Sequence, residues 1–143
     1  MKNNRIAGII AGALGGALLL SGCSGSEQNL GIQGELRDAR IKLNANYTGS
    51  QSEMTMVSEF QLTLAAMELQ HLRYSICNQS NYDEIEQAFQ KDEQAWEALC
   101  QQEQEKPSEF AGGSRAPMDH NMRMTAFLEK RIAELKSKWC ADK

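Results

Sequence analysis

Apolar residues recur at three- and four-residue steps from Ser50 to about Cys77, which predicts a long helix. They form two adjacent stripes, one of Val57, Phe60, Leu64 and Met67 and one of Leu62, Ala65, Leu69, Leu72 and Ile76. Ser50 and Glu53 have the spacing of a capping box, which marks the start of a helix. We therefore expect a helix with a wide apolar face over this stretch.

Two further stretches have the same helical period. The first runs from about Tyr82 to Glu105, and Asn81 is expected to cap it with Glu84. Its predicted inward positions are Ile85, Phe89, Trp96 and Leu99. Pro107 and Gly112-Gly113 end it, because Pro lacks an N–H donor and Gly allows positive φ.

The third stretch begins near residues 117–119 and continues to about Trp139. Its predicted core positions are Met124, Phe127, Leu128, Ile132, Leu135 and Trp139. No stretch alternates like a β-strand for long. The sequence therefore predicts an all-α fold, a three-helix antiparallel bundle or hairpin that follows a leader and a tether.

The leader is an uncharged run over residues 6–20, preceded by Lys2 and Arg5. As a helix this run would rise only about 23 Å, less than the ~30 Å hydrocarbon core of a bilayer. Residues 20–23 read Leu-Ser-Gly-Cys, which matches the lipobox of bacterial lipoprotein precursors. We expect residues 1–22 to be a removed signal peptide and Cys23 to carry lipid.

Acylation of Cys23 would anchor the protein to a membrane, since two or three chains hold a protein stably. The residue after Cys23 is Ser24 rather than Asp, which implies the outer membrane, facing the periplasm. Residues 23–49 are rich in Gly, Ser, Asn and Gln and are predicted to form a flexible tether of about 28 Å. A short helix over residues 35–43 is the alternative. Residues 50–143 form the predicted helical domain.

Charge narrows the choice of partners. The chain has 15 basic and 19 acidic side chains, and removal of residues 1–22 leaves a net charge of −6. This acidity argues against nucleic acid and suits a basic protein. Eight acids lie in residues 83–105 against Lys91 alone, whereas residues 114–143 have seven basic and four acidic side chains. The second helix is therefore expected to present an acidic field.

With Cys23 acylated, Cys77, Cys100 and Cys140 remain. In an up-down-up bundle, Cys77 and Cys140 lie at the same end, whereas Cys100 lies roughly 27 Å along the second helix. A disulfide tolerates a Cα separation of only about 7 Å. We therefore predict a Cys77–Cys140 disulfide with Cys100 free, and three unpaired thiols are the alternative.

Three segments together resemble the lysozyme-inhibitor LprI-type domain of bacterial lipoproteins and periplasmic proteins. They read Gln-Ala-Trp at residues 94–96, Gly-Gly-Ser-Arg-Ala-Pro-Met at 112–118 and Arg-Ile-Ala-Glu-Leu at 131–135. The resemblance covers about residues 50–137, but the usual family cysteines are absent. It implies a non-catalytic protein that binds and inhibits lysozyme-type cell-wall hydrolases. The motif residues Trp96, Pro117, Arg131, Glu134 and Leu135 are expected to be structural.

Binding residues are assigned by hypothesis to two places. The turn of Gly112, Gly113 and Ser114 is a possible binding tip, although its simpler interpretation is a connection between helices. Glu93 and Glu97 are candidate contacts for a basic partner. Trp96 is expected in the core, and Arg131 is expected to brace the bundle by pairing with a carboxylate of the second helix.

The remaining chemistry is sparse. His71 and His120 lie on different elements, and no Cys/His cluster has ligand spacing, so no metal or other cofactor is expected. No Ser stands in a hydrolase motif, so we expect no catalysis. The leading hypothesis is an envelope lipoprotein that blocks a lysozyme-type hydrolase. A structural or adaptor lipoprotein in an envelope assembly is the alternative.

Overall fold

The chain folds as an all-α bundle in a computed structural model that describes residues 26–140. Four helices and no strand occur in this part of the chain: α2 (Ser26–Ala45), α3 (Gln51–Cys77), α4 (Tyr82–Glu105) and α5 (Ala116–Trp139). The last three correspond to the three predicted helices, and their bounds agree within one or two residues. The all-α prediction is therefore confirmed, with one helix more than expected.

The start of α3 has the predicted capping box. Ser50 accepts a hydrogen bond from the Glu53 backbone N–H, and the Glu53 carboxylate accepts one from the Ser50 backbone N–H. A hydrogen bond from the Thr48 hydroxyl to the same carboxylate is the main reason that the pKa of Glu53 falls to about 2. At α4 the prediction was wrong, because Asn81 makes no side-chain cap hydrogen bond.

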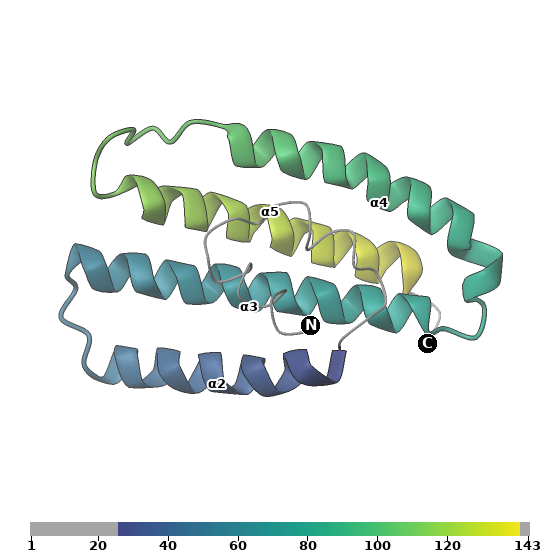
Figure 1. Ribbon diagram of the computed structural model, residues 1–143, viewed down its shortest axis with the longest axis horizontal. Coiled ribbons are helices and arrows are strands. Elements are labelled where there is room, and N and C mark those ends of the chain that lie inside the picture. The colour runs from purple at the N-terminus through teal and green to yellow at the C-terminus, as the bar shows by residue number, and fades with distance from the viewer. Residues whose placement is uncertain (1–25, 141–143) are drawn as a thin grey trace, which may run out of the picture.

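The helices lie side by side in the order α2, α3, α5, α4 (Figure 1). α3 occupies the middle, with α2 on one side of it and α5 on the other. The main core lies among α3, α4 and α5. Its buried members are Ala65, Leu69, Ile76, Phe89, Trp96, Cys100, Met124, Leu128, Ile132 and Leu135.

For one residue of α4 the predicted core position is wrong. Leu99 is 54% exposed, whereas its neighbour Cys100 is 1% exposed. Phe89, Trp96 and Cys100 are seven and four residues apart and therefore share one face of a 3.6-residue helix. Leu99 lies about 100° away from Cys100 around the helix axis. The small cysteine therefore takes the inward position that was expected for leucine.

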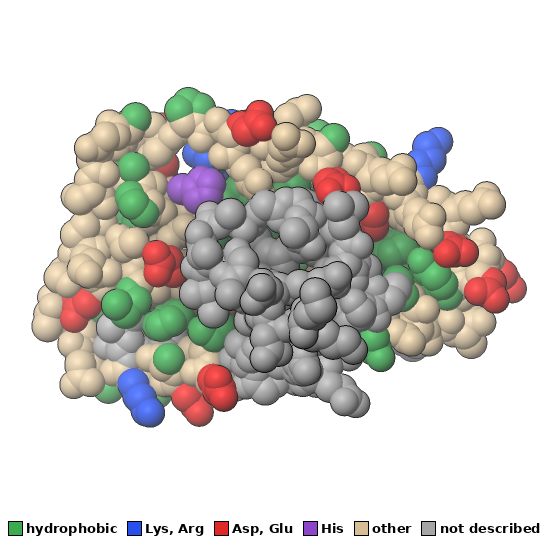
Figure 2. All heavy atoms as spheres, in the orientation of Figure 1, with side chains coloured by type: hydrophobic (Ala, Val, Ile, Leu, Met, Phe, Trp, Pro, Cys, Tyr) green, Lys and Arg blue, Asp and Glu red, His purple; other side chains and the backbone are tan. Residues whose placement is uncertain are grey.

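The predicted tether is largely a helix. Residues 26–45 form α2, which packs along α3 in the antiparallel direction, and residues 23–25 lie outside the described part of the chain. The α3 stripe of Val57, Phe60, Leu64 and Met67 lies outside the main core, yet Met67 is only 1% exposed. Hydrophobic side chains gather where α2 lies against α3 (Figure 2). We infer that this stripe of α3 packs against α2. The sequence of residues 26–45 did not predict this contact because few of its residues are apolar.

We expect amide hydrogen exchange to distinguish a docked α2 from a tether. Amides of residues 34–45 should exchange far more slowly than those of an unstructured chain, because their N–H groups are hydrogen-bonded within the helix. Exchange measured by mass spectrometry on residues 24–143 provides the test. Exchange over residues 34–45 at the rate of an unstructured chain would contradict the docked helix and favour the flexible tether that the sequence predicts.

The predicted Cys77–Cys140 disulfide is not formed, since Cys100 and Cys140 are free thiols. The topological part of the prediction is correct, because α3 and α5 both end at the same end of the bundle. There the Gln79 amide donates a hydrogen bond of 3.1 Å to the Trp139 carbonyl, and its nitrogen lies 4.0 Å from Cys140 Sγ. A shared end of the bundle is therefore not sufficient for a disulfide, which also requires a specific Cβ geometry.

The two free thiols should differ in reactivity. Burial raises the pKa of Cys100 to about 11, and its side chain is 1% exposed, whereas Cys140 is half-buried at the end of α5. Because the thiolate is the nucleophile, iodoacetamide at pH 8 should modify Cys140 well before Cys100. Peptide mapping after brief alkylation checks this order. Early modification of Cys100 would contradict the core packing.

Among residues 26–140, no helix is both long and apolar enough to span a membrane. The predicted signal peptide and Cys23 lie outside the described residues. The anchor thus remains a prediction from the sequence.

Candidate functional site

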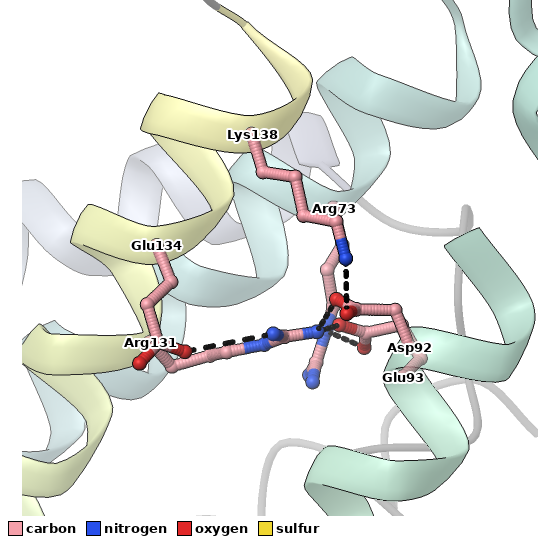
Figure 3. Close-up of polar contacts among 6 residues, drawn as sticks. All are labelled: Arg73, Asp92, Glu93, Arg131, Glu134 and Lys138. Carbon is pink, nitrogen blue, oxygen red and sulfur yellow. Dashed lines mark hydrogen bonds and ion pairs between the residues drawn. The ribbon is translucent and has the colours of Figure 1, made fainter. Parts of the chain in front are cut away.

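Charged side chains from three helices meet between α4 and α5 (Figure 3). We name this group the arginine–carboxylate cluster. Its members are Arg73 from α3, Asp92 and Glu93 from α4, and Arg131, Glu134 and Lys138 from α5. All of the helices of the main core contribute to it.

Arg131 is the centre of the cluster. Its side chain is 5% exposed and extends from α5 toward α4. Nη2 donates hydrogen bonds of 2.8 Å to Asp92 Oδ2 and 2.5 Å to Glu93 Oε1, and Nη1 lies 3.7 Å from Glu134 Oε2. Arg131 therefore braces α5 against α4, the role that the sequence predicts for it.

Arg73 approaches the same carboxylates from α3. It is 3% exposed, and its Nε forms an ion pair with Glu93 Oε2. Burial lowers the pKa of Arg73, and the negative charge of Glu93 acts in the opposite direction. Glu93 thus bridges two buried guanidinium groups, one from each neighbouring helix. A partner protein would have to compete with both arginines for this carboxylate.

Trp96 lies beneath both guanidinium groups. The centroid of its ring is 4.9 Å from Arg73 Cζ and 5.5 Å from Arg131 Cζ, within the range of cation–π attraction. The ring also stacks on Phe127, with centroids 5.7 Å apart and planes inclined by 22°. Trp96 is 5% exposed and thus lies in the core, as expected.

The geometry of the cluster indicates a structural role. The charged groups of the cluster are paired with one another, and within the cluster Arg73 Nη2 and Arg131 Nε are buried without a polar partner among the described residues. Removing one member of a buried ion pair strongly destabilises the folded protein, because the other charge stays buried without a partner. The cluster therefore fixes the position of α4 on the α3–α5 pair.

Asp92 should make the stability of the bundle depend on pH. Partial burial raises its pKa, but the hydrogen bonds from Lys138 and Arg131 outweigh burial and hold the pKa below the usual 3.8. Its contribution is therefore complete above pH 3.8 and is lost as the pH falls through the lower folded-state pKa. Urea unfolding of the wild type and Asp92→Asn should converge at low pH. A difference that stays constant from pH 7 to pH 2 would contradict this pairing.

The predicted binding tip lies in the loop between α4 and α5, away from the cluster. Gly112, Gly113 and Ser114 are exposed, and Gly112 has a φ of +81°, which favours glycine. Arg123 holds the approach to this loop by donating hydrogen bonds to the carbonyls of Glu103 at 3.3 Å and Lys106 at 3.0 Å. The loop is thus a fixed connection, and Pro117 stands in the first turn of α5.

The structure brings some of the predicted residues together and separates others. Trp96, Glu93, Arg131 and Glu134 meet in the cluster, and Leu135 is fully buried in the core beside it. Glu97 is half-buried on α4, one turn beyond Glu93. Cys23 lies outside the described residues. The candidate site is therefore not one constellation but a buried brace and a separate exposed loop.

Sequence reasoning missed Arg73, Asp92 and Lys138. Arg73 carried a signal, because it stands among Leu69, Leu72 and Ile76 on the apolar stripe of α3. A charge in such a position is almost never buried without a partner. Nothing in the spacing of Asp92 or Lys138 distinguishes them from solvated surface charges.

α4 has carboxylates without a counter-charge among the described residues, some exposed and some half-buried. Five of its carboxylates form no ion pair with another described residue, and we name them the α4 acidic face: Asp83, Glu84, Glu86, Glu97 and Glu105. The other three acids of α4, Asp92, Glu93 and Glu103, pair with arginine or lysine. The negative charge left for a partner is therefore exposed at Asp83, Glu84 and Glu105 and partly exposed at Glu86 and Glu97.

Within residues 26–140, no group of three His, Cys, Asp or Glu side chains is placed to hold a metal ion. Comparison with protein-family models, curated proteins and solved structures finds no match to the chain. The LprI-type resemblance thus stays a prediction from the motifs.

Proposed function

We propose that this chain is a lipid-anchored protein of the bacterial cell envelope that binds a lysozyme-type cell-wall hydrolase and blocks it without catalysis. The observation that carries the proposal is the α4 acidic face, whose five carboxylates have no internal counter-charge. The motifs at residues 94–96, 112–118 and 131–135 support it through their resemblance to the LprI-type domain.

Electrostatics favour a basic partner. The chain after residue 22 has a net charge of −6. Asp92 and Glu93 are neutralised by arginine, so the charge available to a partner on α4 is that of the α4 acidic face. Complementary charge accelerates association and sets orientation more than it adds affinity. Lysozymes of the animal type are basic and cut with two carboxylates in a cleft, so covering that cleft would suffice for inhibition.

The anchor supports the envelope part of the proposal. The lipobox at residues 20–23 implies a diacylglycerol thioether on Cys23, and Ser24 favours the outer membrane facing the periplasm. An inhibitor held there would meet an invading hydrolase before it degrades the wall.

The binding test compares two charge variants. Glu84→Gln/Glu97→Gln removes two charges from the α4 acidic face, and Glu59→Gln/Glu129→Gln removes two exposed charges from α3 and α5. Titration calorimetry of residues 24–143 with hen egg-white lysozyme should show binding that the first variant weakens several-fold and the second changes little. An equal effect of both variants would contradict a role for this face.

Crosslinking in intact cells separates the proposal from the adaptor alternative. A stable endogenous partner, with no change in sensitivity to lysozyme when the protein is absent, would favour a structural lipoprotein. Increased sensitivity to lysozyme without such a partner would favour the inhibitor.

A further inference from the structure

The docked position of α2 limits where a lipid on Cys23 can be. Ser26 is the first residue of α2, so three residue steps separate it from Cys23. A fully extended chain covers at most about 3.6 Å per residue, so the lipidated residue lies within about 11 Å of the start of α2. This limit holds for any conformation of residues 23–25.

The start of α2 lies toward the end of the bundle where α3 passes into α4 (Figure 1). α2 has 20 residues and α3 has 27, which correspond to about 30 Å and 40 Å of helix. Since α2 runs antiparallel to α3 from the short connection at residues 46–50, α3 extends about 10 Å beyond the start of α2. The link from Ser26 to Cys23 spans at most about 11 Å, and α3 extends about 10 Å beyond Ser26. A fully extended link is therefore just long enough to bring the lipid level with the end of the bundle.

We propose that this end of the bundle, formed by the α3–α4 turn and the C-terminal end of α5, lies directly against the lipid headgroups. The proposal rests on the lipidation of Cys23 that the proposed function includes. A folded head cannot enter the bilayer, so the short link leaves no slack between the anchor and the turn. The occupant of this surface is the membrane to which the lipid itself belongs.

The chemistry of this end suits a headgroup layer. The turn consists of four uncharged polar residues, Asn78, Gln79, Ser80 and Asn81, and Gln79 ties it to the end of α5. Tyr82 and Trp139 are half-buried there and both pack edge-on against Phe89, with ring centroids 6.2 Å and 5.5 Å away. Tyr82 thus has an apolar side and a solvent-exposed side, as is typical of tyrosine at membrane interfaces, whereas the indole Nε1 of Trp139 is buried.

The alternative is a bundle that lies on its α2 side. The described side chains of residues 34–45 that are exposed include Glu35, Arg37, Asp38 and Lys42, together with the apolar Ile41, which is 62% exposed. A helix that lies in the interface needs a continuous outward apolar face, and one isoleucine among four charged side chains does not provide it over these residues. We therefore place the long axis of α3 away from the membrane plane, with the α4–α5 loop at the far end.

The consequence concerns the partner. The exposed loop of Gly112, Gly113 and Ser114 stands about one length of α3 from the lipid, roughly 40 Å. The α4 acidic face begins beside the α3–α4 turn with Asp83, Glu84 and Glu86, and Glu97 and Glu105 lie farther along α4 toward the loop. A soluble hydrolase can then reach the loop and this farther part of α4 without approaching the bilayer.

The test measures the depth of two matched positions in the mature lipoprotein. Ser80 in the α3–α4 turn and Ser114 in the α4–α5 loop are both exposed serines at opposite ends of the bundle. Each is replaced in turn by an azido amino acid, coupled to the same dye and measured in neutral phosphatidylcholine vesicles that contain spin-labelled headgroups. We expect quenching to be several-fold stronger at position 80 than at position 114.

An insertion supplies the control. Ten Gly/Ser residues placed between Gly25 and Ser26 add a coil of roughly 18 Å and should reduce the difference between the two positions. Equal quenching at both positions in the uninserted protein would overturn the orientation while leaving anchoring and inhibition in place. Absence of quenching at both would overturn anchoring together with the orientation. Inhibition by soluble residues 24–143 is judged separately, in an assay without membranes.

Discussion

Replacing Trp96 by alanine should lower the free energy of unfolding by about 4 kcal/mol, a typical cost of removing a buried tryptophan. Its indole is 5% exposed, stacks on Phe127 and lies beneath the guanidinium groups of Arg73 and Arg131. The substitution leaves a cavity and removes both cation–π contacts from charges that remain buried. Urea unfolding of residues 24–143, followed by far-ultraviolet circular dichroism, measures the loss.

Trp96→Phe is the matched control, because it keeps an aromatic face beneath the two arginines. We expect it to cost clearly less than the alanine substitution. The domain as a whole has a stability of about 5 to 15 kcal/mol, so Trp96→Ala consumes a large part of it. A loss below about 1 kcal/mol for Trp96→Ala would show that Trp96 does not hold α4 to the bundle.

The second large effect is expected at Glu93. Glu93→Gln removes the charge that both Arg73 and Arg131 face, while the shape of the side chain stays nearly the same. Arg73, which is 3% exposed, then has no ion pair with a described residue, and Arg131, which is 5% exposed, keeps only Asp92 and the more distant Glu134. Breaking a buried pair in this way costs about 3 kcal/mol or more. Urea unfolding of the variant against the wild type measures this cost.

A second substitution tests whether the loss of stability comes from an unpaired buried charge or from altered packing. Arg73→Met in the Glu93→Gln background removes the buried charge that lost its partner, and it should restore part of the free energy of unfolding. Glu129→Gln, which removes an exposed charge from α5, should change stability by less than about 0.5 kcal/mol. A Glu93→Gln variant as stable as Glu129→Gln would contradict the pairing. Any loss of partner binding on substitution of Glu93 should therefore be traced first to loss of fold.

The parts of the fold that the sequence predicted are those with a strong local signal. The helical period of α3, α4 and α5 is sustained over more than six turns each, and the capping box at Ser50 and Glu53 marks the start of α3 closely. Arg131 was expected to pair with a carboxylate of the second helix, which it does through Asp92 and Glu93. These features depend on residues near in sequence or on simple antiparallel geometry.

The parts that failed depend on contacts between distant segments. Residues 26–45 have a weakly apolar sequence that is typical of a linker, and their helix packs on a second stripe of α3. The partnership of Arg73 with Glu93 joins two helices at positions that no local pattern relates. The Cys77–Cys140 prediction placed both residues at one end correctly but could not specify side-chain geometry.

Turbidity of a cell-wall suspension tests the proposed inhibition most directly. Hen egg-white lysozyme is added to the suspension with an excess of residues 24–143, in which Cys23 is omitted, and clearing is followed over time. We expect clearing to slow in proportion to the amount of protein added, and to recover when Glu84→Gln/Glu97→Gln replaces the wild type. Clearing that is equally fast with and without the wild-type protein, together with no binding in a pull-down, would contradict the proposed function.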